Sequence, residues 1–186
     1  MEGAEAEGMD GFEEAQIIRR VQAGGRDEFR HLVGRYKSGL FRIVGNLVDS
    51  AQVEDIVQEA FLAAYTHICR FDPERGSFCA WLYRIARNLA LNARKKKREQ
   101  PLPEDMVIAD ERTPDDEAQK NEIFRQLDQA LEGLRFQDRV IFVLAELEGL
   151  PYAEIARIEG LRIGTVKSRL ARTRSKLRSL LESCVS

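Results

Sequence analysis

Near its C-terminal end the chain has a predicted helical segment on which every charged residue is positive. Between Gly160 and Leu181 there are seven lysines and arginines and no aspartate or glutamate. The same segment carries a stripe at helical spacing, made of Val166, Leu170, Thr173 and Leu177. Such a helix can bury its stripe against its own domain and leave its cations free to meet phosphates and guanine edges in the major groove of DNA.

The residues just before this segment complete a DNA-binding pattern. Residues 152–161 predict a short helix and a tight turn, in which Gly160 can supply a positive φ. Gly164 or Thr165 can then start the second helix. This arrangement indicates a helix-turn-helix. The alternative is an ordinary surface helix, but solvated faces usually mix both signs of charge, so the pattern favours DNA binding.

A second group of residues suited to nucleic acid lies on a predicted helix over residues 78–98. Its first half has the aromatic residues Phe78, Trp81 and Tyr83 near Arg84, Arg87 and Asn88, and its last five residues, 94–98, are all lysine or arginine. Aromatic rings can stack on unpaired bases at about 1–3 kcal/mol per base, and cations suit a phosphate backbone. The aromatic spacing equally suits core packing, so each ring is a candidate for either role.

The elements that must position these groups are all predicted to be helical. Periodic apolar residues favour helices over residues 13–23, 29–47, 50–68, 78–98, 123–134 and 137–148, with a loop at 71–77. No strand-like alternation is present, so the predicted fold class is all-α. We expect two small helical domains at 13–98 and 118–186, a disordered acidic terminus at 1–12 and an extended acidic linker at 99–117.

The charge is distributed unevenly along the chain, although the net charge is only −2. Residues 1–14 carry −6, residues 15–98 carry +8, residues 99–117 carry −7 and residues 118–186 carry +3. Two basic domains are therefore separated by an acidic segment. Local clusters decide which partners a protein attracts, so the pattern indicates nucleic-acid binding despite a pI of about 5.9.

Several classes of protein are disfavoured by what the sequence contains. It has no apolar stretch of about 20 residues and no apolar signal region, which predicts a cytoplasmic protein without membrane contact. Three scattered cysteines and two histidines favour neither a disulfide framework nor a metal site. Walker, zinc-protease and nucleophile-elbow motifs are missing, and the carboxylates are expected in linkers and on solvent faces. We therefore expect neither an enzyme nor a cofactor.

Three strings, taken in order, resemble the sigma-70 family of transcription initiation factors. Residues 53–62 (VEDIVQEAFL) are similar to region 2.2, residues 78–88 (FCAWLYRIARN) to regions 2.3 and 2.4, and residues 163–172 (IGTVKSRLAR) to region 4.2. A linker stands where other members have region 3, and region 1.1 is missing. The chain thus resembles the extracytoplasmic function (ECF, group 4) subfamily over about residues 13–182.

The resemblance implies partners and residue roles. It implies that an acidic face made of Glu54, Asp55, Gln58 and Glu59 docks on the β′ clamp helices of core RNA polymerase, with further contact to the β flap. Promoter DNA would be melted and bound at the minus-ten element by Phe78, Trp81, Arg84, Asn88, Arg94 and Lys95. The minus-thirty-five element would be read by Thr165, Lys167, Ser168, Arg169 and Arg172. The loop 71–77 would capture a flipped base, and an anti-sigma factor is expected to regulate the chain.

One alternative function remains open from the residues alone. A helix-turn-helix regulator can act without polymerase, but it needs a dimerisation surface or a ligand pocket. The N-terminal half shows neither signature, so the sequence favours an initiation factor.

Overall fold

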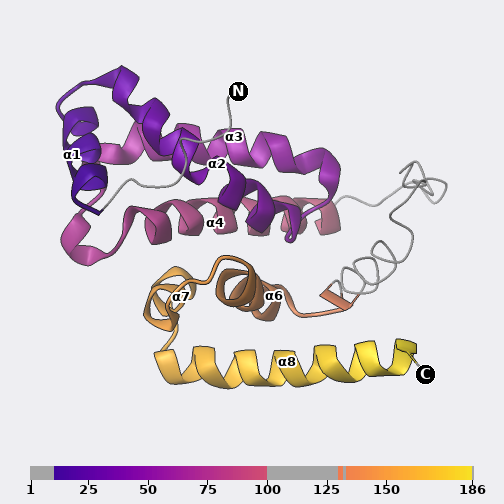
Figure 1. Cartoon of the computed structure of the whole chain (residues 1–186). Helices are drawn as coiled ribbons and strands as arrows, with labels where there is room; N and C mark the ends of the chain where they lie inside the picture. The colour runs from indigo at the N-terminus through magenta and orange to yellow at the C-terminus, as the bar shows by residue number, and fades with distance from the viewer. Residues whose placement is uncertain (1–10, 100–129, 132, 186) are drawn as a thin grey trace, which may run out of the picture.

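The chain folds into helices throughout the part that the computed structural model describes, which is residues 11–99, 130–131 and 133–185 (Figure 1). The all-α prediction is confirmed. The N-terminal domain contains α1 (Gly11–Gln22), α2 (Phe29–Gly45), α3 (Ser50–His67) and α4 (Phe78–Glu99). The C-terminal domain contains α6 (Phe136–Phe142), α7 (Tyr152–Glu159) and α8 (Ile163–Val185). Short 3-10 turns cover Arg26–Glu28, Ile68–Arg70 and Pro73–Arg75, and a π-helical turn covers Val143–Leu147.

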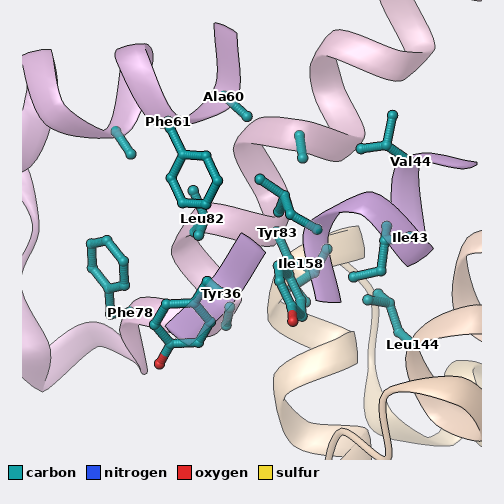
Figure 2. Close-up of a cluster of buried hydrophobic side chains, with 14 of the residues drawn as sticks. Tyr36, Ile43, Val44, Ala60, Phe61, Phe78, Leu82, Tyr83, Leu144 and Ile158 are labelled. Atoms are coloured by element: carbon teal, nitrogen blue, oxygen red, sulfur yellow. The ribbon is translucent and has the colours of Figure 1, made fainter. Parts of the chain in front are cut away.

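The N-terminal domain is built around α2, α3 and α4, whose apolar stripes face one another. Val44 and Leu82 are completely buried there, and Phe78 is 1% exposed (Figure 2). Helix α1 is fixed to α2 by Glu14, which accepts a hydrogen bond from Tyr36 and pairs with Arg35 at 3.2 Å. This domain therefore gives α4 a rigid base.

The C-terminal domain has the predicted helix-turn-helix. Gly160 ends α7 with φ +65°, the left-handed conformation that the turn requires. The stripe of α8 is buried as expected, with Val166 fully buried and Leu170 1% exposed. One feature was not predicted: α6 widens into the π-helical turn, in which the backbone N–H of Glu148 donates to the carbonyl of Val143 at 3.1 Å.

Two of the predicted domain boundaries differ from those observed. Helix α1 begins at Gly11, two residues before the expected helix, so Gly11 and Phe12 do not belong to an irregular terminus. Acidic residues in its first turn, Glu13 and Glu14, suit a helix N-terminus. Helix α4 extends to Glu99, the first residue of the expected linker. The remaining predictions for the terminus, the linker and the start of the C-terminal domain fall on residues outside the described ranges.

The two domains are packed together rather than held apart. Helix α7 packs against α4 (Figure 1). One continuous hydrophobic cluster contains buried residues of both domains. Figure 2 shows Tyr83 of α4 beside Ile158 of α7, with Leu144 close to Ile43. A smaller cluster, including Leu134 and Leu177, lies between α8 and the residues before α6. Among the described residues, no helix is long and apolar enough to cross a membrane.

Candidate nucleic-acid interface

The outer face of α8 presents the polar residues that sequence analysis assigned to DNA. Lys167, Ser168 and Arg172 are exposed, and Thr165 is half-buried in the first turn of the helix. Arg172 donates from Nε to the carbonyl of Ser168 at 3.3 Å, so its guanidinium stays on the surface of its own helix. These side chains stand opposite the buried stripe, where a major groove could receive them.

Arg169 differs from its neighbours because it turns toward α6. Its Nη1 donates to Oε1 of Gln137 at 2.8 Å and lies 3.5 Å from Oδ1 of Asp138. The side chain is about one quarter exposed. In this conformation Arg169 ties α8 to α6, and it is less available to DNA than Lys167 or Arg172.

On α4, three of the predicted residues share one accessible face. Arg84 and Asn88 are exposed, and Trp81 is half-buried one turn earlier. The indole of Trp81 packs on Phe71 and Phe78, with ring centroids 5.5 and 5.6 Å away. Because these two rings hold the indole from behind, Trp81 is the aromatic residue of this helix best placed to offer a surface to a base.

Phe78 lies in the core instead of on that face. Its ring is 1% exposed and packs against Phe71, Trp81 and Tyr36. The sequence-based role for Phe78 in base stacking is therefore corrected, because this conformation leaves no face of the ring accessible. The core alternative, open at the sequence level, is the one that the structure favours for this residue.

The cations toward the end of α4 are divided between solvent and the C-terminal domain. Lys95 is exposed. Arg94 is half-buried, donates to the carbonyl of Leu47 at 3.1 Å and lies 5.5 Å from the ring centre of Phe136. Arg87, which the sequence places in the group suited to nucleic acid, lies 5.7 Å from the same ring. The aromatic ring of Phe136 on α6 thus makes cation–π contacts with two arginines of α4.

The loop before α4 is ordered by contacts on both sides. The amide of Gln22 in α1 donates to the carbonyls of Ile68 and Phe71 at 2.9 and 3.1 Å. The Oγ of Ser77 accepts from the N–H of Ala80 at 3.1 Å, which caps α4. A groove of about 210 Å³ lies between this loop and α1.

Helix α3, which lies on the side of the N-terminal domain away from the helix-turn-helix (Figure 1), has a separate acidic face. Glu54, Asp55, Gln58 and Glu59 are all exposed there. Leu62, one turn further along, is 65% exposed. Leu62 was not among the predicted site residues, although its position outside the buried stripe of α3 was a usable signal. Together these residues form an accessible, mainly acidic surface with one exposed apolar side chain.

Direct polar contacts join the two domains through carboxylates of the C-terminal domain. Glu159 accepts from Nε and Nη2 of Arg87 at 2.8 and 3.0 Å. Glu154 accepts from Oγ of Ser77 at 2.8 Å. Glu148 pairs with Arg42 and accepts from the hydroxyl of Tyr83 at 3.4 Å.

These contacts correct the expectation that the carboxylates lie in linkers and on solvent faces. The side chain of Glu159 is completely buried, and that of Glu148 is 6% exposed. The sequence does not reveal the role of these residues, because an acid on a short helix or turn has the same pattern as a solvated one.

Cys79, on the first turn of α4, is half-buried against the same interface. Burial raises the pKa of its thiol to about 12. Burial also raises the pKa of the neighbouring Tyr83 hydroxyl. At neutral pH both groups are therefore protonated. Among the described residues, no three histidine, cysteine, aspartate or glutamate side chains gather in a way that could hold a metal ion.

Comparison with known proteins gives the family. The model of Sigma-70 region 2 matches residues 32–100, and that of Sigma-70 region 4 matches residues 124–177. The ECF RNA polymerase sigma-E factor of Haemophilus influenzae is 32% identical over 89% of this chain and 94% of its own length. The ECF RNA polymerase sigma factor SigW of Bacillus subtilis is 33% identical over 88% and 94%. The chain belongs to the ECF sigma factors.

Solved structures are similar to this sigma factor over most of its length. CnrH, in complex with the cytosolic domain of CnrY, has a TM-score of 0.70 and 28% identity, covering 90% of this chain and 96% of its own. The sigma factor RpoE from Bartonella quintana, in complex with the anti-sigma factor NepR, has a TM-score of 0.66 and 26% identity, covering 83% and 97%. The sigma factor is therefore a DNA-binding regulator of transcription rather than an enzyme, and its two domains are regions 2 and 4.

Proposed function

We propose that this sigma factor directs core RNA polymerase in the cytoplasm to promoters that carry a minus-thirty-five and a minus-ten element, and that it helps to melt the second. The observation that carries the proposal is the two-sided chemistry of α8. Its apolar stripe is buried in region 4, while Lys167, Ser168 and Arg172 are exposed on the opposite face. That arrangement suits direct reading of base edges in a major groove.

Region 2 would bind the melted minus-ten strand. Trp81 offers a partly exposed ring for stacking, Asn88 offers an amide for a base edge, and Arg84 and Lys95 offer cations for phosphates. Binding unstacked bases offsets part of the cost of opening the duplex, which is a few kcal/mol per step. The loop 71–77 lies at the start of the same helix and would hold a flipped base.

Polymerase would bind at the acidic face of α3. Glu54, Asp55, Gln58, Glu59 and Leu62 are accessible together on the side of region 2 away from region 4. The mixed acidic and apolar character suits a protein partner more than DNA. We propose the β′ clamp helices for this face, and the β flap as a further contact of region 4.

An anti-sigma factor is the expected regulator. Two structural relatives were solved with a bound partner, and for one of them that partner is named an anti-sigma factor. We propose a partner of the same kind for this chain.

The experiment is run-off transcription with purified core polymerase on a library of genomic fragments, followed by mapping of the start sites. We expect starts at a shared two-part sequence in the presence of the sigma factor and none with core alone. The variant Arg172→Ala serves as a matched control, because it should lose starts while still binding core. Transcription from no specific site, with inhibitor absent, would refute the proposal. Specific DNA binding without polymerase would favour the helix-turn-helix regulator instead.

A further inference from the structure

The last residue of α1 contacts the segment that leads from α3 to α4. The side-chain amide of Gln22 donates from Nε2 to the backbone carbonyl of Ile68 at 2.9 Å and to that of Phe71 at 3.1 Å. In the other direction, the thiol of Cys69 donates to the backbone carbonyl of Gln22 at 4.0 Å. A glutamine amide has two N–H donors, so the two carbonyls use its full donor capacity. Gln22 precedes residues 32–100 and therefore lies outside the part of the chain that the Sigma-70 region 2 model matches.

The two carbonyls lie where the chain leaves a helical turn. Ile68–Arg70 form a 3-10 turn after α3, and Phe71 follows it in an extended conformation, with φ −71° and ψ 128°. Carbonyl groups at the end of a helical turn often lack a partner in their own helix and take one from elsewhere. Gln22 is that partner here, so it fixes the direction in which the loop 71–77 begins.

A groove beside these hydrogen bonds increases their importance for the loop. It has a volume of about 210 Å³, lies between α1 and the loop, and is lined by Ile18, Gln22, Phe71 and Pro73 among others. Because this space is open, the loop is not packed continuously against α1. The Gln22 amide therefore provides much of the attachment between the two.

Phe71 connects this attachment to Trp81. The Phe71 side chain is 7% exposed, and its ring centroid lies 5.5 Å from that of Trp81. The other ring behind the indole is that of Phe78, which belongs to α4 itself and lies 5.6 Å away. One support of the indole thus comes from its own helix, and the other comes from the residue whose carbonyl Gln22 holds.

From these observations we propose that Gln22 of α1 is a positioning residue for the base-stacking surface of Trp81. Its amide holds the backbone at Phe71, the ring of Phe71 supports the indole, and the indole presents its accessible face to an unpaired base. The inference rests on the minus-ten binding proposed above and adds α1 to the elements that shape that site. A surface that is already ordered loses less entropy on binding, so loss of the amide weakens base binding although Gln22 itself need not touch DNA.

The test uses the fluorescence of the full-length protein, because Trp81 is the only tryptophan in the sequence. The variant is Gln22→Met, which keeps the length and the apolar body of the side chain but removes both donors. We expect its indole emission to shift to longer wavelength and its quenching by acrylamide to increase. Binding to a labelled single-stranded oligonucleotide of mixed sequence, measured by fluorescence anisotropy, should weaken roughly fivefold, which is close to the contribution of one neutral hydrogen bond. The matched control is Gln16→Met, at a half-buried position of the same helix, which should leave all three quantities unchanged.

A double-mutant cycle tests whether Gln22 acts through the indole. Trp81→Ala alone should weaken binding of the oligonucleotide, and adding Gln22→Met to it should cause no further loss, because residues that act together are not additive. Gln22→Lys should restore the wild-type quenching, since an ammonium group can donate to both carbonyls. Acrylamide is neutral, so the added charge does not affect that comparison.

Wild-type quenching in Gln22→Met would overturn the proposal, and so would a loss of affinity that adds to the loss in Trp81→Ala. An equal effect in Gln16→Met would also overturn it. If circular dichroism shows that Gln22→Met has lost helix, Phe71→Leu replaces it, because that variant removes the ring behind the indole and keeps an apolar side chain; the same quenching and the same lack of additivity are expected. A wild-type protein that does not bind the oligonucleotide would contradict the proposed minus-ten function, whereas the quenching comparison tests the position of the indole without DNA.

Discussion

Arg169 donates a hydrogen bond to Gln137 across the α8–α6 contact at 2.8 Å, whereas Arg172, one turn further along α8, donates to the carbonyl of Ser168 in its own helix. The two arginines have the same chemistry and are three residues apart. Their surroundings nevertheless differ: Arg169 contacts α6 within region 4, whereas Arg172 is exposed on the face proposed to bind DNA.

Substituting these arginines should separate stability from DNA binding. Arg172→Ala should weaken binding to a minus-thirty-five duplex by roughly 1–3 kcal/mol with unchanged resistance to urea. Arg169→Ala should lower the free energy of unfolding by about 1 kcal/mol, and Gln137→Ala should have a similar effect because it removes the same hydrogen bond. Urea titrations and duplex binding by the same variants check both expectations. An Arg169→Ala protein as stable as wild type would contradict the positioning role.

The acidic face of α3 predicts a specific loss of polymerase binding. Asp55→Lys and Leu62→Ser should each reduce affinity for core polymerase, the first by charge reversal and the second by removing an exposed apolar contact. Asp27→Lys, at an exposed position before α2, is the matched control and should bind core normally. Pull-down or interferometry with purified core measures the difference. If Asp55→Lys binds core polymerase as tightly as the control, this face is excluded as the polymerase-binding surface.

Gly39 of α2 provides a steric probe of the contact between regions 2 and 4. A Cβ at this position would collide with the hydroxyl of Tyr83 and come within 2.9 Å of Oε2 of Glu148. Gly39→Ala should therefore loosen the contact between the regions and enlarge the protein in solution. The control is Gly34→Ala in the same helix, where a Cβ meets nothing within 4 Å. That substitution should stabilise the fold by up to about 1 kcal/mol, because alanine favours helix. Equal scattering curves for the two variants would argue against the collision.

Substitutions at Phe78 and Trp81 should affect different properties. The first should mainly lower stability, and the second should mainly impair promoter opening. Phe78→Ala removes a buried ring and should cost about 3–5 kcal/mol of folding free energy. Trp81→Ala should be milder in stability but should reduce the binding of unpaired bases by about 1–3 kcal/mol. Thermal unfolding, together with permanganate reactivity of promoter thymines, distinguishes the two effects. Normal promoter opening by a well-folded Trp81→Ala protein would show that the indole is not part of the minus-ten binding site.

The buried thiol predicts a slow alkylation reaction. The thiolate is the reactive form, and a pKa near 12 leaves Cys79 almost entirely protonated at pH 8, whereas Cys69 is exposed. In a Cys184→Ser background, iodoacetamide should modify Cys69 first, and the rate at Cys79 should rise as the pH approaches 12. Peptide mass spectrometry follows both sites. Equal rates at pH 8 would indicate that Cys79 is accessible in solution.

The sequence was sufficient for the features that depend on periodicity. The stripe of α8 and the turn at Gly160 could be predicted because helical spacing and a glycine's freedom are local properties. The direction in which Arg169 points could not be predicted from the sequence. Periodicity separates buried from exposed positions, but it does not say which neighbour a half-buried side chain contacts. Phe78 shows the same limit, since core and base-stacking roles share one spacing.

The contact between regions 2 and 4 was beyond prediction from the sequence for another reason. Arg87 and Glu159 are 72 residues apart, and each resembles an ordinary charged residue on an amphipathic helix. Only the packing of α7 on α4 makes them a buried pair. The acidic linker predicts two separate modules, whereas the described parts of the chain are joined by a common core.

The π-helical turn at Val143–Leu147 gives two nearby carboxylates separate partners. Glu146 pairs with Arg174 of α8, inside its own domain, and Glu148 pairs with Arg42 of the other domain. The wider turn contains one more residue than a regular α-helical turn would. Losing that residue would rotate everything after it and break both pairs together. The length of this short segment is therefore constrained as strictly as its composition, and relatives that tolerate a deletion here must hold their domains together by other means.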